Sequence, residues 1–153
     1  MSLKDSKTFC AAPWMHLHVI NDGRAYPCCM TEIVDELSVG NVKTQSLESI
    51  MNSSKMKSMR KSMLREQPLP DSCIRCKGRE DAGFSSMRIG MNDNWYNKVQ
   101  DLVERTKEDG TIDELRLLYW DIRFSNYCNL SCRTCSPVFS TSWTKDYIRL
   151  RAH

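Results

Sequence analysis

The spacing of hydrophobic and polar positions changes along the chain, and the first clear pattern is an alternation over residues 14–20. This stretch ends at an Asn-Asp-Gly sequence at 21–23. Because Asp-Gly favours the positive φ angles of a tight turn, the pattern predicts a hairpin that returns through residues 24–27. The predicted hairpin carries Cys28 back towards the level of Cys10.

Two helices are predicted in the middle of the chain. Ser46 is a candidate cap for a short first helix, and Ser53 or Ser54 is a candidate cap for a second one. We interpret the methionines of the second helix as core packing. Its basic residues are interpreted as a solvated face rather than a site for acidic ligands. The methionines are Met56, Met59 and Met63, and the basic residues are Lys55, Lys57, Arg60, Lys61 and Arg65.

Residues 82–93 show no clear period and predict a connector. Beyond it, apolar residues recur at i, i+4, i+7 and i+8, as on one face of an amphipathic helix. Asn92 or Asn94 is available as its cap and Gly110 as its stop. Trp95 is assigned to the core.

A nearly continuous apolar run over residues 117–124 predicts a strand that is covered on both faces in a parallel sheet. Trp120 is accordingly assigned to the core. Asp121 and Arg123 share one face of this strand, where they would either line a polar interior or form an ion pair. A final helix is predicted over residues 140–150. The C-terminal part therefore reads as strand, loop and helix.

Composition excludes several classes of protein. The chain has 153 residues, of which 41% are hydrophobic, enough for one domain or for a small domain plus part of another. It contains no run of 18 apolar residues, and residues 1–10 lack the apolar core of a signal peptide. A cytoplasmic protein without a membrane span is expected. The net charge of +3 is too small to indicate a nucleic-acid partner.

Eight cysteines in a cytoplasmic chain are more typical of metal ligands than of disulfides, and their clustering strengthens this interpretation. The last three are spaced C-x3-C-x2-C directly after the predicted strand. Three thiolates leave a four-iron cluster one ligand short, and such an open iron is typical of a reactive site. The three groups are Cys10 with Cys28 and Cys29, Cys73 with Cys76, and Cys128 with Cys132 and Cys135.

The loop at residues 125–135, which follows the predicted strand, resembles the radical S-adenosylmethionine (radical SAM) enzymes. The resemblance implies a [4Fe-4S] cluster on three cysteines, with S-adenosylmethionine bound to the fourth iron. The cysteine triplet would be Cys128, Cys132 and Cys135, with Tyr127 and Thr134 beside the cofactor. Many family members have an aromatic residue where this chain has Thr134.

The first part of the chain resembles the SPASM/twitch module, which carries auxiliary iron-sulfur clusters in radical SAM maturases. Cys10, twelve residues, a glycine, four residues and Cys28 match the opening of that module. The resemblance implies one auxiliary [4Fe-4S] cluster, with Cys29 as the alternative to Cys28. Residue 82 is Ala where full-length modules continue with another cysteine. The implied ligands, here called the cysteine quartet, are Cys10, Cys28, Cys73 and Cys76.

The expected fold follows from these two resemblances. Residues 1–82 would form an α+β SPASM/twitch-like domain with a β-hairpin and short helices. Residues 83–112 would form a connector with an amphipathic helix, and residues 113–153 the first β-α unit of an α/β partial TIM barrel. Only 18 residues follow Cys135, so the barrel is expected to be incomplete and this chain alone inactive.

Two functional hypotheses from different classes remain at this stage. The first is a radical SAM enzyme, or its N-terminal portion, which cleaves S-adenosylmethionine to a 5′-deoxyadenosyl radical. The resemblance implies a peptide or small-molecule substrate and a reductant such as flavodoxin or ferredoxin. The second is a non-catalytic iron-sulfur or zinc module that acts through a partner, because four thiolates also suit zinc. His16 and His18 are interpreted as packing or hydrogen-bonding residues.

Overall fold

A computed structural model describes residues 3–152, which form a small mixed α/β unit with a four-stranded sheet. The strand order is β3-β2-β1-β4. The strands are β1 (His16–Val19), β2 (Arg24–Tyr26), β3 (Gly40–Asn41) and β4 (Tyr119–Ile122). The α-helices are α1 (Ala12–Met15), α2 (Leu47–Met51), α3 (Ser54–Leu64), α4 (Ile74–Asp81), α5 (Met87–Glu104) and α6 (Thr144–Arg151). Short 3-10 turns span Leu3–Asp5, Asp35–Leu37, Asp71–Cys73 and Thr141–Trp143.

The predicted hairpin is confirmed, since β1 pairs with β2 antiparallel and the turn between them contains Gly23 at φ +94°. The strand is shorter than the alternation predicted. Trp14 and Met15 belong to α1, which Pro13 opens from within its first turn. Proline suits that position because its fixed φ is helical and its missing N–H has no partner in the first turn.

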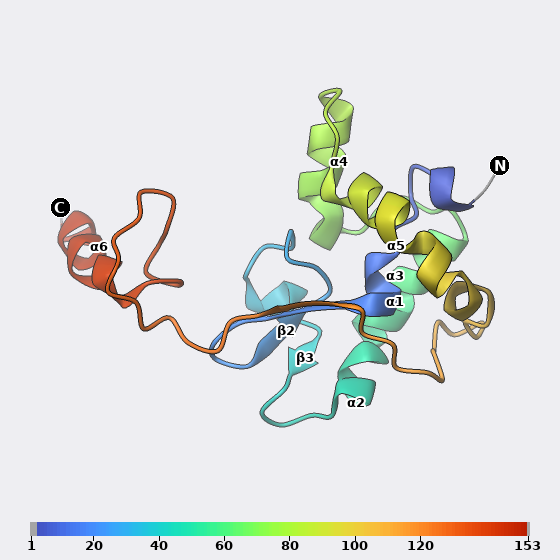
Figure 1. Cartoon of the computed structure of the whole chain (residues 1–153), viewed down its shortest axis with the longest axis horizontal. Coiled ribbons are helices and arrows are strands. Elements are labelled where there is room, and N and C mark those ends of the chain that lie inside the picture. The colour runs from blue at the N-terminus through green and yellow to red at the C-terminus, as the bar shows by residue number, and fades with distance from the viewer. Residues whose placement is uncertain (1–2, 153) are drawn as a thin grey trace.

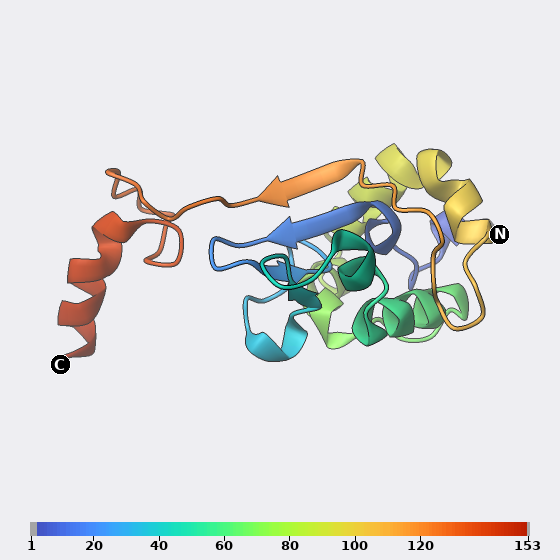
Figure 2. The same ribbon diagram turned by 90° about the horizontal axis from the view of Figure 1, so that it is seen from below.

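Strand β4 lies beside β1 in parallel, with Tyr119 opposite His16 and Ile122 opposite Val19. Figures 1 and 2 both show this pairing. The prediction that this strand is covered on both faces is wrong, because Trp120 is 44% exposed and Ile122 is 37% exposed. β4 is an edge strand, and no other strand of residues 3–152 pairs with its outer side.

The central helices follow their local signals. Ser46 and Ser53 cap α2 and α3 by accepting hydrogen bonds from Ser49 N and Met56 N. The predicted packing of the methionine stripe is confirmed, because its three side chains lie in one core cluster with α1, α5 and the sheet. The three are Met56, Met59 and Met63.

Helix α5 begins earlier than predicted. Ser86 is its cap, so residues 87–93 are helical rather than part of a connector, and the last helical residue is Glu104 rather than a residue next to Gly110. The helix packs into the same core as α1. Trp95 packs against that core as expected.

The prediction that the basic residues of α3 form a solvated face is wrong for Arg60. Arg60 has an exposed fraction of 0%, whereas Lys55 and Arg65 are exposed. Its guanidinium donates to carbonyl oxygens of the neighbouring segments, including that of Gly110 at 2.7 Å. These hydrogen bonds offset part of the cost of burying the guanidinium charge.

The C-terminal segment leaves the main body after β4 and ends in α6, as Figures 1 and 2 show. The predicted order of strand, cysteine loop and helix is confirmed, with α6 over Thr144–Arg151. Within the part of the chain that the structure describes, no helix is both long enough and apolar enough to span a membrane.

Gly110 is expected to be essential for the close approach of its loop to α3. Its φ is +87°, and a Cβ atom at this position would lie 2.2 Å from the carbonyl oxygen of Lys57. Gly110→Ala is therefore expected to lower the free energy of unfolding by about 2 to 4 kcal/mol, from backbone strain and the clash together.

Gly83→Ala is the control for this prediction. Gly83 has a similar φ of +81°, and a Cβ atom there would have no neighbour within 4 Å, so only about 1 kcal/mol should be lost. Urea unfolding of both variants measures the difference, and equal losses would contradict the role of the close approach.

Candidate functional site

Four cysteines from three segments line one pocket in the main body of the molecule. Cys10 precedes α1, Cys28 follows β2, Cys73 ends a 3-10 turn and Cys76 lies in the first turn of α4. These are the four residues of the cysteine quartet. Across residues 3–152, no three of their sulfurs all lie within 4.8 Å of one another.

The local structure of each segment explains its contribution. Cys73 is the residue before α4 and Cys76 the third residue of that helix, and a separation of three residues places two side chains on the same side of a helix. The hairpin returns the chain from β1 to β2, so Cys28 comes back to the segment that holds Cys10. The C-x2-C spacing and the hairpin together bring the four cysteines to the wall of the same pocket.

Helix α5 holds the Cys10 segment from outside the hairpin. The side-chain oxygen of Asn92 accepts from Ala11 N at 2.9 Å, and its amide nitrogen donates to Phe9 O at 3.0 Å. Asn92 is therefore not the helix cap that the sequence predicted. It is a buried residue in the helix interior that fixes the backbone on both sides of Cys10. Sequence reasoning missed this role because the contact spans 81 residues and has no local period.

The rest of the pocket wall is mostly apolar, with five methionines and three small or proline residues. Burial raises the pKa of Cys10 to about 12 and that of Cys73 to about 11. Both thiols are therefore protonated at neutral pH without a metal, and metal binding must release their protons. The methionines are Met30, Met59, Met63, Met87 and Met91, and the others are Ala12, Pro13 and Pro27.

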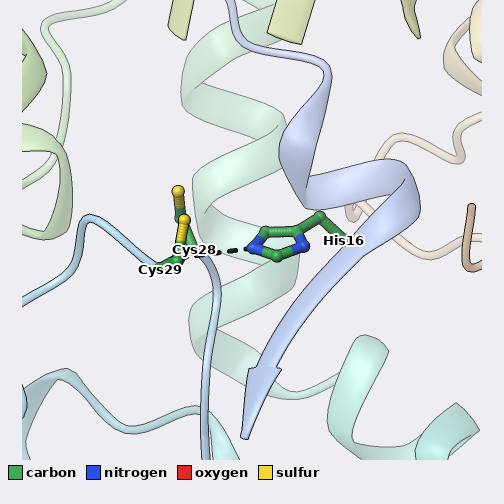
Figure 3. A group of neighbouring side chains, drawn as sticks. All are labelled: His16, Cys28 and Cys29. Carbon is green, nitrogen blue, oxygen red and sulfur yellow. Dashed lines mark hydrogen bonds between the residues drawn. The ribbon is translucent and has the colours of Figure 1, made fainter. Parts of the chain in front are cut away.

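Cys28 and Cys29 lie together because β2 ends at Tyr26, before the strand could turn their side chains to opposite faces. Their sulfurs and a ring nitrogen of His16 all lie within 4.8 Å of one another (Figure 3). Hydrogen bonding with Cys29, together with burial, raises the pKa of Cys28, whereas the hydrogen bond from Cys28 lowers the pKa of Cys29. Cys29 does not line the quartet's pocket.

The ring of His16 is already held by two hydrogen bonds. Its Nε2 accepts from the backbone N–H of Cys29 at 3.3 Å, so Nδ1 carries the proton and donates to Tyr119 O at 2.9 Å. The ring also stacks on that of Tyr119 at 4.6 Å. The interpretation of this histidine as a packing and hydrogen-bonding residue is confirmed, and it joins the Cys28 loop to β4.

His18 makes a second link to β4. Its Nδ1 lies 3.0 Å from the Oδ2 of Asp121, and burial lowers the pKa of His18 despite this carboxylate. Asp121 pairs with His18, and Arg123, the residue after β4, lies over the ring of Phe139, so the described residues show no ion pair between Asp121 and Arg123. Both β1 histidines are therefore buried contacts with β4.

The cysteine triplet lies in the extended C-terminal segment. Cys128 and Cys135 are half-buried and Cys132 is exposed, and across residues 3–152 the three sulfurs are not all within 4.8 Å of one another. The 3-10 turn before α6 closes the loop, since Ser142 donates to Cys128 O at 2.6 Å and Trp143 donates to Cys132 O at 3.1 Å.

The two residues predicted to flank the cofactor are both open to solvent. Tyr127 is 89% exposed, and Thr134 is exposed beside Cys135. The triplet's loop thus has a defined backbone but is open to solvent at Tyr127, Cys132 and Thr134. The quartet, by contrast, lines a pocket, and Cys10 and Cys76 are buried.

Comparison with known proteins supports the first of these sites. Residues 10–77 match the family model of SPASM, described as an iron-sulfur cluster-binding domain. The match covers less than half of the chain and includes all four cysteines of the quartet. Searches of curated proteins and of solved structures found no match. Iron-sulfur binding is therefore indicated for residues 10–77.

Proposed function

We propose that this chain is a radical SAM enzyme, or the N-terminal portion of one, and holds one auxiliary [4Fe-4S] cluster in the quartet's pocket. The observation that carries the proposal is the gathering of four cysteines, all within the SPASM match, from three segments around one largely apolar pocket. Thiolates are the usual ligands of iron-sulfur clusters. The donor set therefore fits the group.

The family match favours a cluster over a single zinc ion, because the SPASM model that covers the quartet is described as an iron-sulfur cluster-binding domain. Four thiolates alone would also suit zinc. Iron and sulfide content therefore separates the two.

The triplet is proposed to hold the second cluster, with S-adenosylmethionine on its open iron. When bound, that cluster supplies the electron that cleaves S-adenosylmethionine to methionine and the 5′-deoxyadenosyl radical. In this chain, Ser142 and Trp143 fix the backbone of the triplet's loop. Tyr127 and Thr134 are proposed to contact the cofactor. The proposed substrate is a peptide or small molecule, and the proposed electron donor is a flavodoxin or ferredoxin.

A second candidate is an iron-sulfur module without S-adenosylmethionine chemistry. The exposure of Cys132 and of Tyr127 favours it, because both residues lack an enclosing pocket in the described chain. The auxiliary site would then act in binding a partner.

Anaerobic reconstitution of the chain separates the two candidates. The radical SAM proposal predicts about eight iron and eight sulfide per chain, and the module predicts about four of each. Addition of dithionite and S-adenosylmethionine then tests for 5′-deoxyadenosine. A variant with alanine at all three triplet positions should retain about four iron and lose any 5′-deoxyadenosine formation.

Each outcome decides between the candidates. About eight iron with binding of S-adenosylmethionine, seen as a change in the spectrum of the reduced cluster, supports the enzyme even if turnover needs a further domain. About four iron, unaffected by the triplet substitution, supports the module. One zinc and no sulfide would refute both iron-sulfur proposals.

A further inference from the structure

Arg88 is the one basic or acidic residue among the described residues that line the quartet's pocket. Arg88 comes from the first turn of α5, beyond the segment that matches the SPASM model. It is 6% exposed. A cluster with four thiolate ligands carries net negative charge, and burying such charge in an apolar pocket is costly unless a cation compensates it. Arg88 is placed where that compensation is needed.

The guanidinium of Arg88 is held rigidly by Glu80 and by the backbone before Cys10. Its Nε and Nη2 donate to the two carboxylate oxygens of Glu80 at 2.9 and 2.6 Å. Its Nη1 donates to Ser6 O and Phe9 O, both at 2.8 Å. These contacts use four of its five N–H donors. The remaining N–H, on Nη2, has no partner within residues 3–152.

Glu80 is the carboxylate that pairs with Arg88. It lines a neighbouring open cleft with Arg88, but it does not line the quartet's pocket. Burial alone would raise the pKa of Glu80, but hydrogen bonds from Arg88 and Ser86 outweigh it and lower the pKa. Glu80 is therefore ionised at neutral pH. Arg88 lines both the pocket and the cleft, whereas Glu80 lines only the cleft.

We propose that Arg88 sets the reduction potential of the auxiliary cluster, by its charge and by donating its remaining N–H to a cluster sulfur. The inference rests on the proposed auxiliary cluster and adds to it a residue that nothing in the cysteine pattern indicates. Reduction adds one electron and makes the cluster one unit more negative, so a fixed cation stabilises the reduced form. Hydrogen bonds to sulfur and nearby charge are established determinants of cluster potential. Glu80 positions Arg88 and offsets part of its charge.

The test uses the full chain with alanine at the three triplet positions, so that only the auxiliary cluster is present. The midpoint potential is measured by anaerobic titration with dithionite, followed by electron paramagnetic resonance. Arg88→Gln should lower the reduced-to-oxidised ratio at the parent midpoint about tenfold, a shift of about 59 mV for a one-electron couple. Glu80→Gln should shift the potential in the opposite direction, by a smaller factor of about three in the ratio, because it removes the opposing charge from farther away.

Opposite shifts separate an electrostatic role from a structural one. If Arg88 and Glu80 have only a structural role, both variants should retain less cluster. The reduction potential should then not shift in opposite directions in Arg88→Gln and Glu80→Gln. Arg88→Lys keeps the positive charge, so its reduction potential should stay close to that of the parent. Arg105→Gln, at the exposed end of the same helix, is the matched control and should leave the potential unchanged.

The outcomes also distinguish this inference from the function on which it rests. An intact cluster whose potential is the same in Arg88→Gln and Glu80→Gln would overturn the role of Arg88 and leave the auxiliary cluster standing. Absence of iron and sulfide from the triplet-free chain would overturn both. If Arg88→Gln retains no cluster, equal potentials in Glu80→Gln and the parent would still overturn the inference.

Discussion

Cys76→Ser is expected to abolish the auxiliary cluster, with the loss of about four iron and four sulfide per chain from the triplet-free variant. Cys76 is 6% exposed and lines the quartet's pocket from the first turn of α4. A serine hydroxyl is a poor replacement for a thiolate because soft sulfur ligands are what iron-sulfur clusters select. Iron and sulfide analysis with visible absorption after anaerobic reconstitution measures the loss.

Cys29→Ser is the matched control, since it removes a thiol of the same region that does not line the pocket. It should retain iron and sulfide at the level of the parent. Loss of the cluster in Cys29→Ser, with retention in Cys28→Ser, would show that Cys29 is the ligand. Retention of the cluster in Cys76→Ser would contradict the assignment of the quartet.

The sequence predicts the quartet's framework because its signals are local. The turn at Gly23, the caps Ser46 and Ser53, and the C-x2-C spacing each act over a few residues, and the structure forms the hairpin, α2, α3 and the start of α4 at those places. The identity of the four ligands stays a prediction. So does the division of the chain at residues 82 and 112.

The features that sequence reasoning missed depend on contacts between distant segments. Asn92 and Arg88 bond to the backbone around Cys10 across about 80 residues, and no periodicity reports such a contact. Trp120 shows the opposite error. An apolar run predicts burial only if other elements cover the strand, and in the described residues β4 is an edge with Trp120 half open to solvent.

Arg60 is a further residue whose environment the sequence does not indicate. It is one of the basic residues of α3 that were predicted to form a solvated face, but its side chain lies in the core. Its guanidinium donates to Pro13 O at 3.1 Å and to Asn52 Oδ1 at 3.3 Å, in addition to the carbonyls of Gly110 and Met51. It therefore joins α1, the end of α2 and the loop after α5. Among residues 3–152 no carboxylate pairs with it. Burial lowers its pKa to about 10, so it remains charged at neutral pH.

Arg60→Met is accordingly expected to lower the free energy of unfolding of the metal-free chain by about 3 to 5 kcal/mol. Methionine fills part of the volume, but it leaves several buried carbonyl groups without donors, and each such group costs about 1 to 3 kcal/mol. Apolar contacts made by the methionine offset part of this loss. The free energy of unfolding of Arg60→Lys should lie between those of the unsubstituted chain and Arg60→Met, because one ammonium group cannot reach all of the acceptors that the guanidinium spans.

Lys61→Met is the matched control, since it removes the neighbouring positive charge on α3, where the side chain is half-buried, and substitutions of this kind change stability by about 0.5 kcal/mol or less. Urea unfolding followed by circular dichroism measures all three variants. If Arg60→Met and Lys61→Met unfold at the same urea concentration, Arg60 does not hold these segments together. If Arg60→Met alone is strongly destabilised, the site's scaffold depends on a buried cation that the sequence presents as part of a solvated face.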